Sequence, residues 1–183
     1  MQRQNVCRLL LSVLLPLALA LPLQAHASPQ LERLAGLDVV LMEDGIFGIA
    51  STYDPLGAED PEGLETASGE NYDPEAWTAA IQIDLRDTFG GVRYGRNYRP
   101  VFALVECGAK RAIVRINDVG PLMPGRIIDL NTRAMRYFDP TFERGLVRNI
   151  VVTPLPGGGW VTGPVDGGDG EDGETLVLSA RQR

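Results

Sequence analysis

The sequence predicts a single, mainly β domain that forms a small closed or nearly closed barrel. Apolar bursts of five to eight residues alternate with Gly, Pro, Asp and Asn, which is the pattern of short strands joined by turns. The 183 residues include 21 Gly and 13 Pro, so many turns are expected. About 156 residues remain after removal of an N-terminal leader, which is enough for one domain.

Residues 1–27 are predicted to be a secretory signal peptide. Two arginines precede an apolar run over 9–23, and Ala25-His26-Ala27 supplies the small residues of a cleavage position. About 15 apolar residues interrupted by two prolines fall short of the roughly 20 that a spanning helix needs. Cys7 precedes the apolar run instead of ending it, so it is badly placed to be the lipid-modified cysteine of a bacterial lipoprotein. We therefore expect a soluble protein exported to the periplasm.

The mature chain divides into a leading segment, the barrel and a tail. In the leading segment, 28–44, leucines recur near the helical period, so a short helix is expected. The barrel domain is expected over 45–155. Residues 156–183 are rich in Gly and acidic residues with almost nothing to bury, which predicts a flexible acidic tail.

Six strands and one helix are expected within the barrel domain. The helix lies between Asn131 and Phe138, where either Asn131 or Asp129 can cap its N-terminus, and Asp139-Pro140 ends it. The acidic stretch 54–65 is predicted to be a surface loop. The predicted strands are 46–53, 79–85, 100–106, 112–116, 126–130 and 146–153.

Composition excludes several kinds of site. With 15 basic and 24 acidic residues the mature part has a formal net charge of −9, which argues against a nucleic-acid groove. The single histidine, His26, lies in the leader, and Cys107 is the one remaining thiol. Serine and cysteine triads with histidine, histidine-ligated zinc and paired-cysteine redox chemistry are therefore excluded. We expect no metal and no cofactor, so the chemistry falls to carboxylates, hydroxyls, amines or the backbone.

Two segments combine polar groups with backbone-shaping residues beside strands. In Thr66-Ala-Ser-Gly-Glu70-Asn-Tyr-Asp73, Gly69 permits a tight turn that presents Glu70. In Val114-Arg-Ile-Asn-Asp118-Val-Gly-Pro121, a strand delivers Asp118 into a Gly-Pro turn. Two carboxylates held at two strand ends can face one cleft, an arrangement that suits cleavage of a glycosidic bond. The alternative is that Asp118 only accepts hydrogen bonds within its own turn.

These motifs resemble the rare lipoprotein A (RlpA) family over about 105 residues, in the family's order. The resemblance implies a six-stranded double-psi β-barrel with one or two short helices. It also implies a periplasmic lytic transglycosylase that cuts peptidoglycan between N-acetylmuramic acid and N-acetylglucosamine, leaves 1,6-anhydro ends, and prefers strands stripped of stem peptides. The motifs are Gly48-Ile-Ala-Ser-Thr-Tyr53, Thr66 to Asp73, Thr78-Ala-Ala80, Val114 to Pro121 and Gly125-Arg-Ile-Ile-Asp-Leu130.

The resemblance also implies which side chains act. By motif match the catalytic pair is Asp118 and Glu70, with Asp118 as acid and base and Glu70 stabilising positive charge, although the two roles could be exchanged. Peptidoglycan glycan strands are the expected partner, bound by a monomer. The expected substrate-binding residues are Asp129, Tyr53, Asn117 and Trp77. For three of them another role stays open, because Asp129 can cap the helix and Tyr53 and Trp77 can be barrel-packing aromatics.

The chain departs from the family pattern at several positions. Ile81 stands where the family has an active-site histidine, Thr52 where it favours tryptophan, and Val119 where it favours arginine. The link 86–100 is about ten residues longer than usual. Its aromatic and basic side chains could form a glycan-binding surface or belong to an extended hairpin with solvated arginines. Those side chains are Arg93, Tyr94, Arg96, Tyr98 and Arg99.

Two further functions stay open at this stage. The departures favour a non-catalytic peptidoglycan-binding or expansin-like cell-wall module, whereas the retained acids favour an enzyme. A secreted inhibitor on the same barrel is a third possibility, but no residue pattern supports it.

Overall fold

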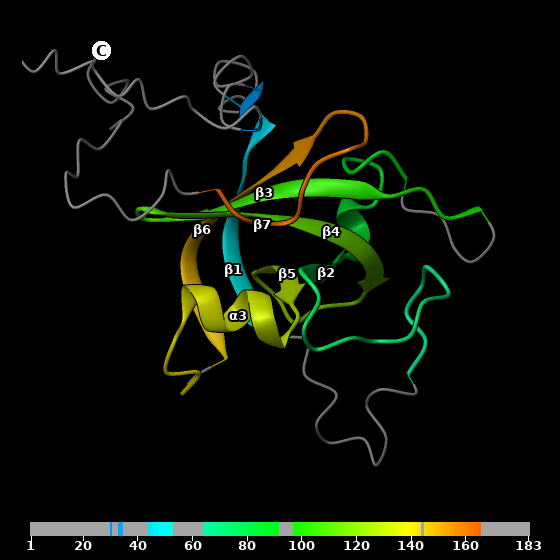
Figure 1. The fold of residues 1–183 in the computed structure, drawn as a ribbon. Helices are drawn as coiled ribbons and strands as arrows, with labels where there is room; N and C mark the ends of the chain where they lie inside the picture. Colours follow the sequence, from blue (N-terminus) through cyan, green and yellow to red (C-terminus); the bar gives the residue numbers. More distant parts are fainter. Residues whose placement is uncertain are drawn as a thin grey trace, which may run out of the picture.

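A computed structural model describes residues 30, 33–34, 44–52, 64–91, 97–143 and 145–165. The predicted signal peptide, most of the leading segment and residues 166–183 lie outside this part of the chain. Within it the molecule is a strand-rich body, and the short α-helix α3 lies below the sheet (Figure 1). No helix in the described ranges is long and apolar enough to cross a membrane.

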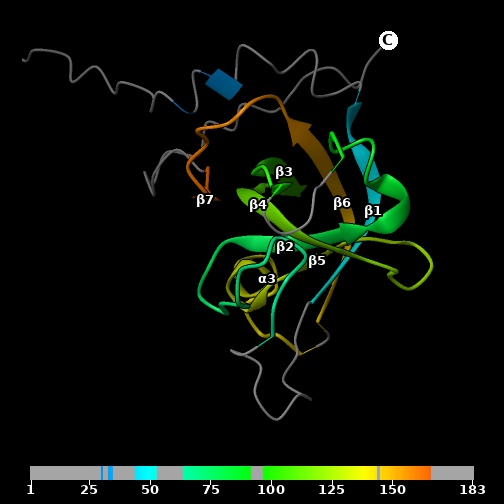
Figure 2. The ribbon, with the colours of Figure 1, turned by 90° about the vertical axis from the view of Figure 1, so that its right-hand side faces the viewer.

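Six strands close into a barrel, as predicted. The order β2-β5-β1-β6-β3-β4 returns to its start because β4 also pairs with β2. The pairs β1–β5 and β2–β4 are parallel, and the others around the ring are antiparallel. Figure 2 shows the strands wrapping around a common centre. The strands are β1 (Ile46–Thr52), β2 (Thr78–Gln82), β3 (Val101–Cys107), β4 (Lys110–Gly120), β5 (Arg126–Leu130) and β6 (Leu146–Leu155).

Two of the predicted strands differ from the observed strands by more than two residues at an end. The segment predicted as 79–85 is a strand only to Gln82, after which Ile83–Leu85 form the 3-10 turn η2. Strand β4 is much longer than 112–116 and continues through Asn117 and Asp118. It stays extended there because its last residues pair in parallel with β2, with a register shift between Ala79 and Ala80.

The helix α3 (Thr132–Phe138) matches the predicted 131–138 helix, and Asn131 is its N-cap. The Asn131 side chain accepts a hydrogen bond of 3.1 Å from the Ala134 amide. Its amide nitrogen donates to the carbonyls of Asp73 (2.9 Å) and Ala76. This one side chain therefore both starts α3 and fixes the chain that leads from Glu70 into β2.

Side chains alternate between the two faces of each barrel strand, as the period of two requires. In β2 the side chains of Ala79 and Ile81 belong to the barrel core, and Ile81 is fully buried. Ala80 lies between them and faces the outside of the barrel. The outer face of β2 and its neighbours is therefore where polar side chains can gather.

Residues 156–165, which the sequence placed in the flexible tail, pack on the outside of the barrel. Their strand β7 (Gly163–Pro164) pairs with β4, and the orange segment in Figure 1 crosses above β3 and β4. Trp160 is buried, and the Arg33 guanidinium lies 3.4 Å from the centre of its ring. A second core outside the barrel results, made of Leu34, Phe102, Leu104, Ile113, Leu155, Trp160 and Val165.

Candidate active site

A row of side chains in register runs across the outer face of four adjacent strands. Ala80 in β2 is the register partner of Asp118 in β4 and also of Asp129 in β5. Asp129 is in turn the partner of Ser51 in β1. Register partners present their side chains on the same face of a sheet. The sheet therefore brings Asp118 and Asp129 onto one face, with the methyl side chain of Ala80 between them.

Asp118 holds the loop 66–70 against β4. Its Oδ1 accepts hydrogen bonds from the amides of Ala67 (3.0 Å) and Val119 (2.9 Å). The Ser68 amide donates to the Asn117 carbonyl at 3.0 Å. Only one of the two Asp118 bonds is local, so Asp118 does more than close its own turn. It fixes the position of the loop that carries Glu70.

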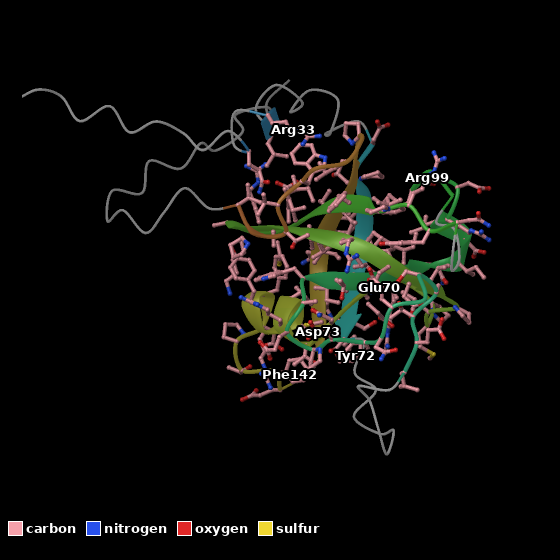
Figure 3. The ribbon with its side chains drawn as sticks, turned by 45° about the vertical axis from the view of Figure 1, so that its right-hand side comes forward. Arg33, Glu70, Tyr72, Asp73, Arg99 and Phe142 are labelled. Atoms are coloured by element: carbon pink, nitrogen blue, oxygen red, sulfur yellow. The ribbon has the colours of Figure 1, made fainter. Side chains whose placement is uncertain are left out.

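Glu70 forms an ion pair with Arg115, and Figure 3 shows it above Tyr72 and Asp73 and below Arg33 and Arg99. Its Oε1 accepts a hydrogen bond of 2.7 Å from Nη1 of Arg115. Gly69 adopts φ +86°, which confirms the predicted tight turn before Glu70. Burial alone would raise the pKa of the Glu70 carboxyl, but Arg115, with hydrogen bonds from Asn117 and Ser68, lowers it below its ordinary value. Glu70 is therefore held as an anion.

Asp129 has the opposite electrostatic character. Burial raises the pKa of its carboxyl, although the hydrogen bond from Ser51 and the charge of Arg126 oppose the rise. The Ser51 hydroxyl donates to Oδ1 of Asp129. Asp129 does not cap α3, since Asn131 has that role. The site thus combines a fixed carboxylate at Glu70 with a carboxyl at Asp129 that retains its proton more readily.

Sequence reasoning missed two polar neighbours of these acids. Arg115 alternates with the buried Val114 and Ile116 along β4, so the period of two could have marked it as an outward charge beside Asp118. Ser51 pairs with Asp129 across two strands that are far apart in sequence, and no local pattern indicates that contact.

The remaining predicted site residues have different surroundings. Asn117 is buried, and its side chain helps to lower the pKa of the Glu70 carboxyl. The Trp77 ring packs against Tyr137 of α3 with ring centres 5.6 Å apart, and the Arg133 guanidinium lies 5.6 Å from its centre. Tyr53 lies outside the described residues. Of the six predicted residues, Glu70 lies in the loop 66–70, and Asp118 and Asn117 are hydrogen-bonded to that loop. Asp129 lies near them because it shares the register partner Ala80 with Asp118.

Position 81 faces the core and not the register row. Ile81 is fully buried, and its register partners are Val119 in β4 and Ile128 in β5. Ile81 and Val119, the two apolar departures noted in the sequence, are therefore cross-strand neighbours that pack into the same core. Each replacement makes the other compatible with an apolar interior.

The acids reach the surface of the barrel to different extents, because 42% of the Glu70 side chain is exposed whereas Asp118 is half-buried. One cavity of about 640 Å³ lies between the end of η2, the start of β3 and the end of β6, and a second of about 390 Å³ lies beside the end of α3. Neither is lined by Glu70, Asp118 or Asp129. Among the residues with described positions, no cluster of three His, Cys, Asp or Glu side chains could hold a metal ion.

Comparison with known proteins gives the barrel a family context. The family model described as lytic transglycolase matches residues 47–151. A probable endolytic peptidoglycan transglycosylase RlpA from a Nostoc species is 43% identical over 90 residues, which are 49% of this chain and 20% of that protein. The endolytic peptidoglycan transglycosylase RlpA of Yersinia pestis is 37% identical over 88 residues, covering 48% of this chain and 20% of that protein. The chain thus spans about a fifth of the length of these curated relatives.

A solved structure with a similar chain course is the Streptomyces papain inhibitor. It shares 21% sequence identity, with a TM-score of 0.46, over 61% of this chain and 94% of its own.

Proposed function

The chain belongs to the lytic transglycolase family of RlpA-type double-psi β-barrels, and on this premise we propose that it is an exported enzyme that cleaves peptidoglycan. The bond cut is the one between N-acetylmuramic acid and N-acetylglucosamine, and the product carries a 1,6-anhydro end. Glycan strands poor in stem peptides are the proposed substrate. The enzyme acts as a soluble periplasmic monomer.

The observation that carries this proposal is the joint placement of Glu70 and Asp118. The loop 66–70 is hydrogen-bonded directly to the Asp118 carboxylate and to the Asn117 carbonyl. Glu70 is ion-paired with Arg115 in the same strand. Two acids from segments 48 residues apart are thus tied into one polar surface, which suits cleavage of a glycosidic bond.

The proposed mechanism assigns a separate role to each acid. Asp118 protonates the glycosidic oxygen and then, as a base, accepts the proton of the C6 hydroxyl of muramic acid, which attacks its own anomeric carbon. Because Oδ1 of Asp118 already accepts two amide protons, Oδ2 is the oxygen that exchanges a proton. Glu70, ionised beside Arg115, stabilises the positive charge that develops on the sugar. Intramolecular attack supplies a high effective concentration of the hydroxyl and needs no activated water.

Asp129 is the competing proton donor in this scheme. It lies in the register row with Asp118, and burial raises the pKa of its carboxyl. We assign it to substrate binding beside Asp118, together with Asn117. Trp77 and Tyr53 complete the proposed binding residues.

The test uses the exported protein and sacculi from which an amidase has removed the stem peptides. Glu70→Gln and Asp118→Asn variants are compared with the matched controls Glu75→Gln and Asp84→Asn, whose side chains are exposed. Anhydro-muramic fragments, detected by mass spectrometry of the soluble fraction, are expected from the wild type and both controls. Each active-site variant should lose at least 100-fold in rate, the lower range for a catalytic acid or base.

The same experiment also tests the second candidate function, a non-catalytic wall-binding module. That candidate is favoured by two departures from the family pattern, Ile81 in place of histidine and Thr52 in place of tryptophan. Sedimentation of the protein with sacculi, without release of fragments by any form of it, would reject the enzyme and leave the binding module.

A further inference from the structure

The loop 121–125 crosses the end of β2 close to both acids of the register row. Strand β4 runs parallel to β2 and ends at Gly120, whereas β5 runs antiparallel to β2 and begins at Arg126. The loop that joins them therefore passes over the C-terminal end of β2. Asp118 lies two residues from the end of β4, and Asp129 lies three residues from the start of β5. Each acid is thus within roughly 7–10 Å of the end of its strand that meets the loop.

Gln82, the last residue of β2, holds this loop through its side chain. Its Nε2 donates to the carbonyl of Leu122 at 3.2 Å, and its Oε1 accepts a hydrogen bond of 2.9 Å from the Leu122 amide. The same Oε1 accepts a hydrogen bond of 2.9 Å from the Ile83 amide. Gln82 is two residues beyond Ala80, so its side chain leaves β2 on the same outer face as the acids. The Gln82 amide group therefore extends the pairing of β2 into the loop.

A turn fixes the other end of the loop. The Arg126 amide donates to the Met123 carbonyl at 3.0 Å, and Gly125 adopts φ +83° in this turn. The Gly125 carbonyl accepts a hydrogen bond of 3.2 Å from the Ile49 amide of β1. The backbone is therefore held on both sides of Met123.

Two large apolar side chains are exposed where the loop meets β2. Ile83 is 45% exposed and Met123 is 62% exposed. They belong to adjacent segments, because the amides of Ile83 and Leu122 donate to one and the same oxygen atom. Exposed apolar side chains that gather in one place mark binding surfaces more often than isolated ones do. The apolar faces of sugar rings and the methyl groups of N-acetyl substituents provide a matching surface on a glycan strand.

We propose that Gln82 is a positioning residue for the substrate, which holds the loop 121–125 so that Ile83 and Met123 form an apolar edge of the glycan-binding surface. This role rests on the proposed function, in which Asp118 and Asp129 face the glycan strand. None of the proposed catalytic groups belongs to the loop. Loss of the Gln82 hydrogen bonds should therefore weaken glycan binding and leave the rate of cleavage of bound glycan unchanged.

The chain contains a matched control for this arrangement. Gln30 makes the same pair of hydrogen bonds to Val161, with Nε2 donating to its carbonyl at 3.0 Å and Oε1 accepting from its amide at 2.9 Å. Val161 is 71% exposed, and it lies in the segment whose strand β7 pairs with the start of β4, at the other end of that strand from Asp118. Gln30→Met and Val161→Ala therefore remove the same kinds of contact as Gln82→Met and Met123→Ala, but away from the acids.

The first measurement is amide hydrogen exchange by NMR, which needs no activity. In Gln82→Met the Leu122 amide should exchange on the order of fivefold faster, the effect of losing one ordinary hydrogen bond. In Gln30→Met the Val161 amide should show that change, and the Leu122 amide should not.

The second measurement is the steady-state kinetics on solubilised glycan strands treated with an amidase. Gln82→Met and Met123→Ala should each raise KM on the order of fivefold, the effect of burying about half of an apolar side chain, with kcat unchanged. Both control variants should keep the KM of the wild type. The double variant should raise KM by less than the product of the two single effects, because Gln82 acts in part through Met123.

Four results would overturn the proposal. These are an unchanged KM in Met123→Ala, a lower kcat with unchanged KM in Gln82→Met, an equal rise of KM in either control, and single effects that multiply in the double variant. If no form of the protein releases fragments from the glycan, the proposed function fails. The Kd of the same strands, measured by isothermal titration calorimetry, then decides the role of the loop. Weaker binding by Met123→Ala than by Val161→Ala would support that role, whereas equal binding or no binding would reject it.

Discussion

Replacing Ile81 by histidine tests whether this position belongs to the core or to the surface that carries the acids. Ile81 is fully buried, with Val119 and Ile128 as register partners. Removing its side chain from the core costs about 1.5–3 kcal/mol of burial free energy. An imidazole without a partner there adds about 1–3 kcal/mol. The free energy of unfolding of Ile81→His should therefore fall by about 3–5 kcal/mol, out of the roughly 5–15 kcal/mol typical of a domain.

The pH dependence of this loss has a definite sign. Burial disfavours the imidazolium, so the pKa of the new histidine is lowered in the folded state. The unfolded chain then binds the proton more tightly, and the free energy of unfolding falls further as the pH drops through about 6.5. Urea unfolding followed by tryptophan fluorescence at pH 7.5 and 5.5 measures both effects.

The control for this experiment is Ile81→Val, which keeps the site apolar and should cost only about 0.5–1.5 kcal/mol. A loss below about 1 kcal/mol in Ile81→His, independent of pH, would refute the reasoning. It would mean that a histidine at position 81 reaches a partner on the outer face. We also expect no gain in glycan cleavage, because the side chain lies on the opposite face of β2 from Ala80.

Two further changes test the surroundings of the site. Asp129→Asn should raise the Tm by roughly 2–4 °C at pH 7 and not at pH 3. The folded protein holds the Asp129 proton more tightly than the unfolded chain does, so the stability of the wild type falls as the pH rises through the raised pKa. A neutral amide at position 129 avoids that loss. An equal gain in Tm at both pH values would contradict this reasoning. Trp160→Ala should lower the free energy of unfolding by about 3–5 kcal/mol, because the Trp160 ring is buried and contacts the Arg33 guanidinium. Urea unfolding measures this loss. A loss below 1 kcal/mol would show that residues 156–165 add nothing to the fold.

The barrel could be predicted because its signals are local. Each strand contains a short apolar burst, and the turn residues between strands are Gly, Pro, Asp and Asn. Asn131 was recognisable as a cap from its position before an apolar helical pattern. The extension of β4 through Asp118 was not recognisable, because polar residues before Gly-Pro are typical of a turn. Only pairing with β2, nearly 40 residues away in sequence, keeps them extended.

The second core could not be predicted for a related reason. Trp160 and Val165 belong to the segment 156–183, which is rich in Gly and carries its acidic residues over 166–174. Their partners include Leu34 and Phe102, which are distant in sequence. The composition of a segment does not show which apolar residues from other parts of the chain will cover it in the folded protein. The pairing of Arg115 with Glu70, 45 residues earlier, escaped prediction in the same way.

The position of Ala80 between two acids has a consequence for how such barrels can vary. Asp118 and Asp129 occupy strands on either side of β2, so their backbones are about two strand spacings, roughly 10 Å, apart. That separation is set by the hydrogen-bond ladder and is independent of any loop. Links such as 86–100 can therefore differ in length and change the shape of the surrounding surface without altering the separation between the backbones of Asp118 and Asp129. A side chain longer than alanine at position 80 would fill the interval between them.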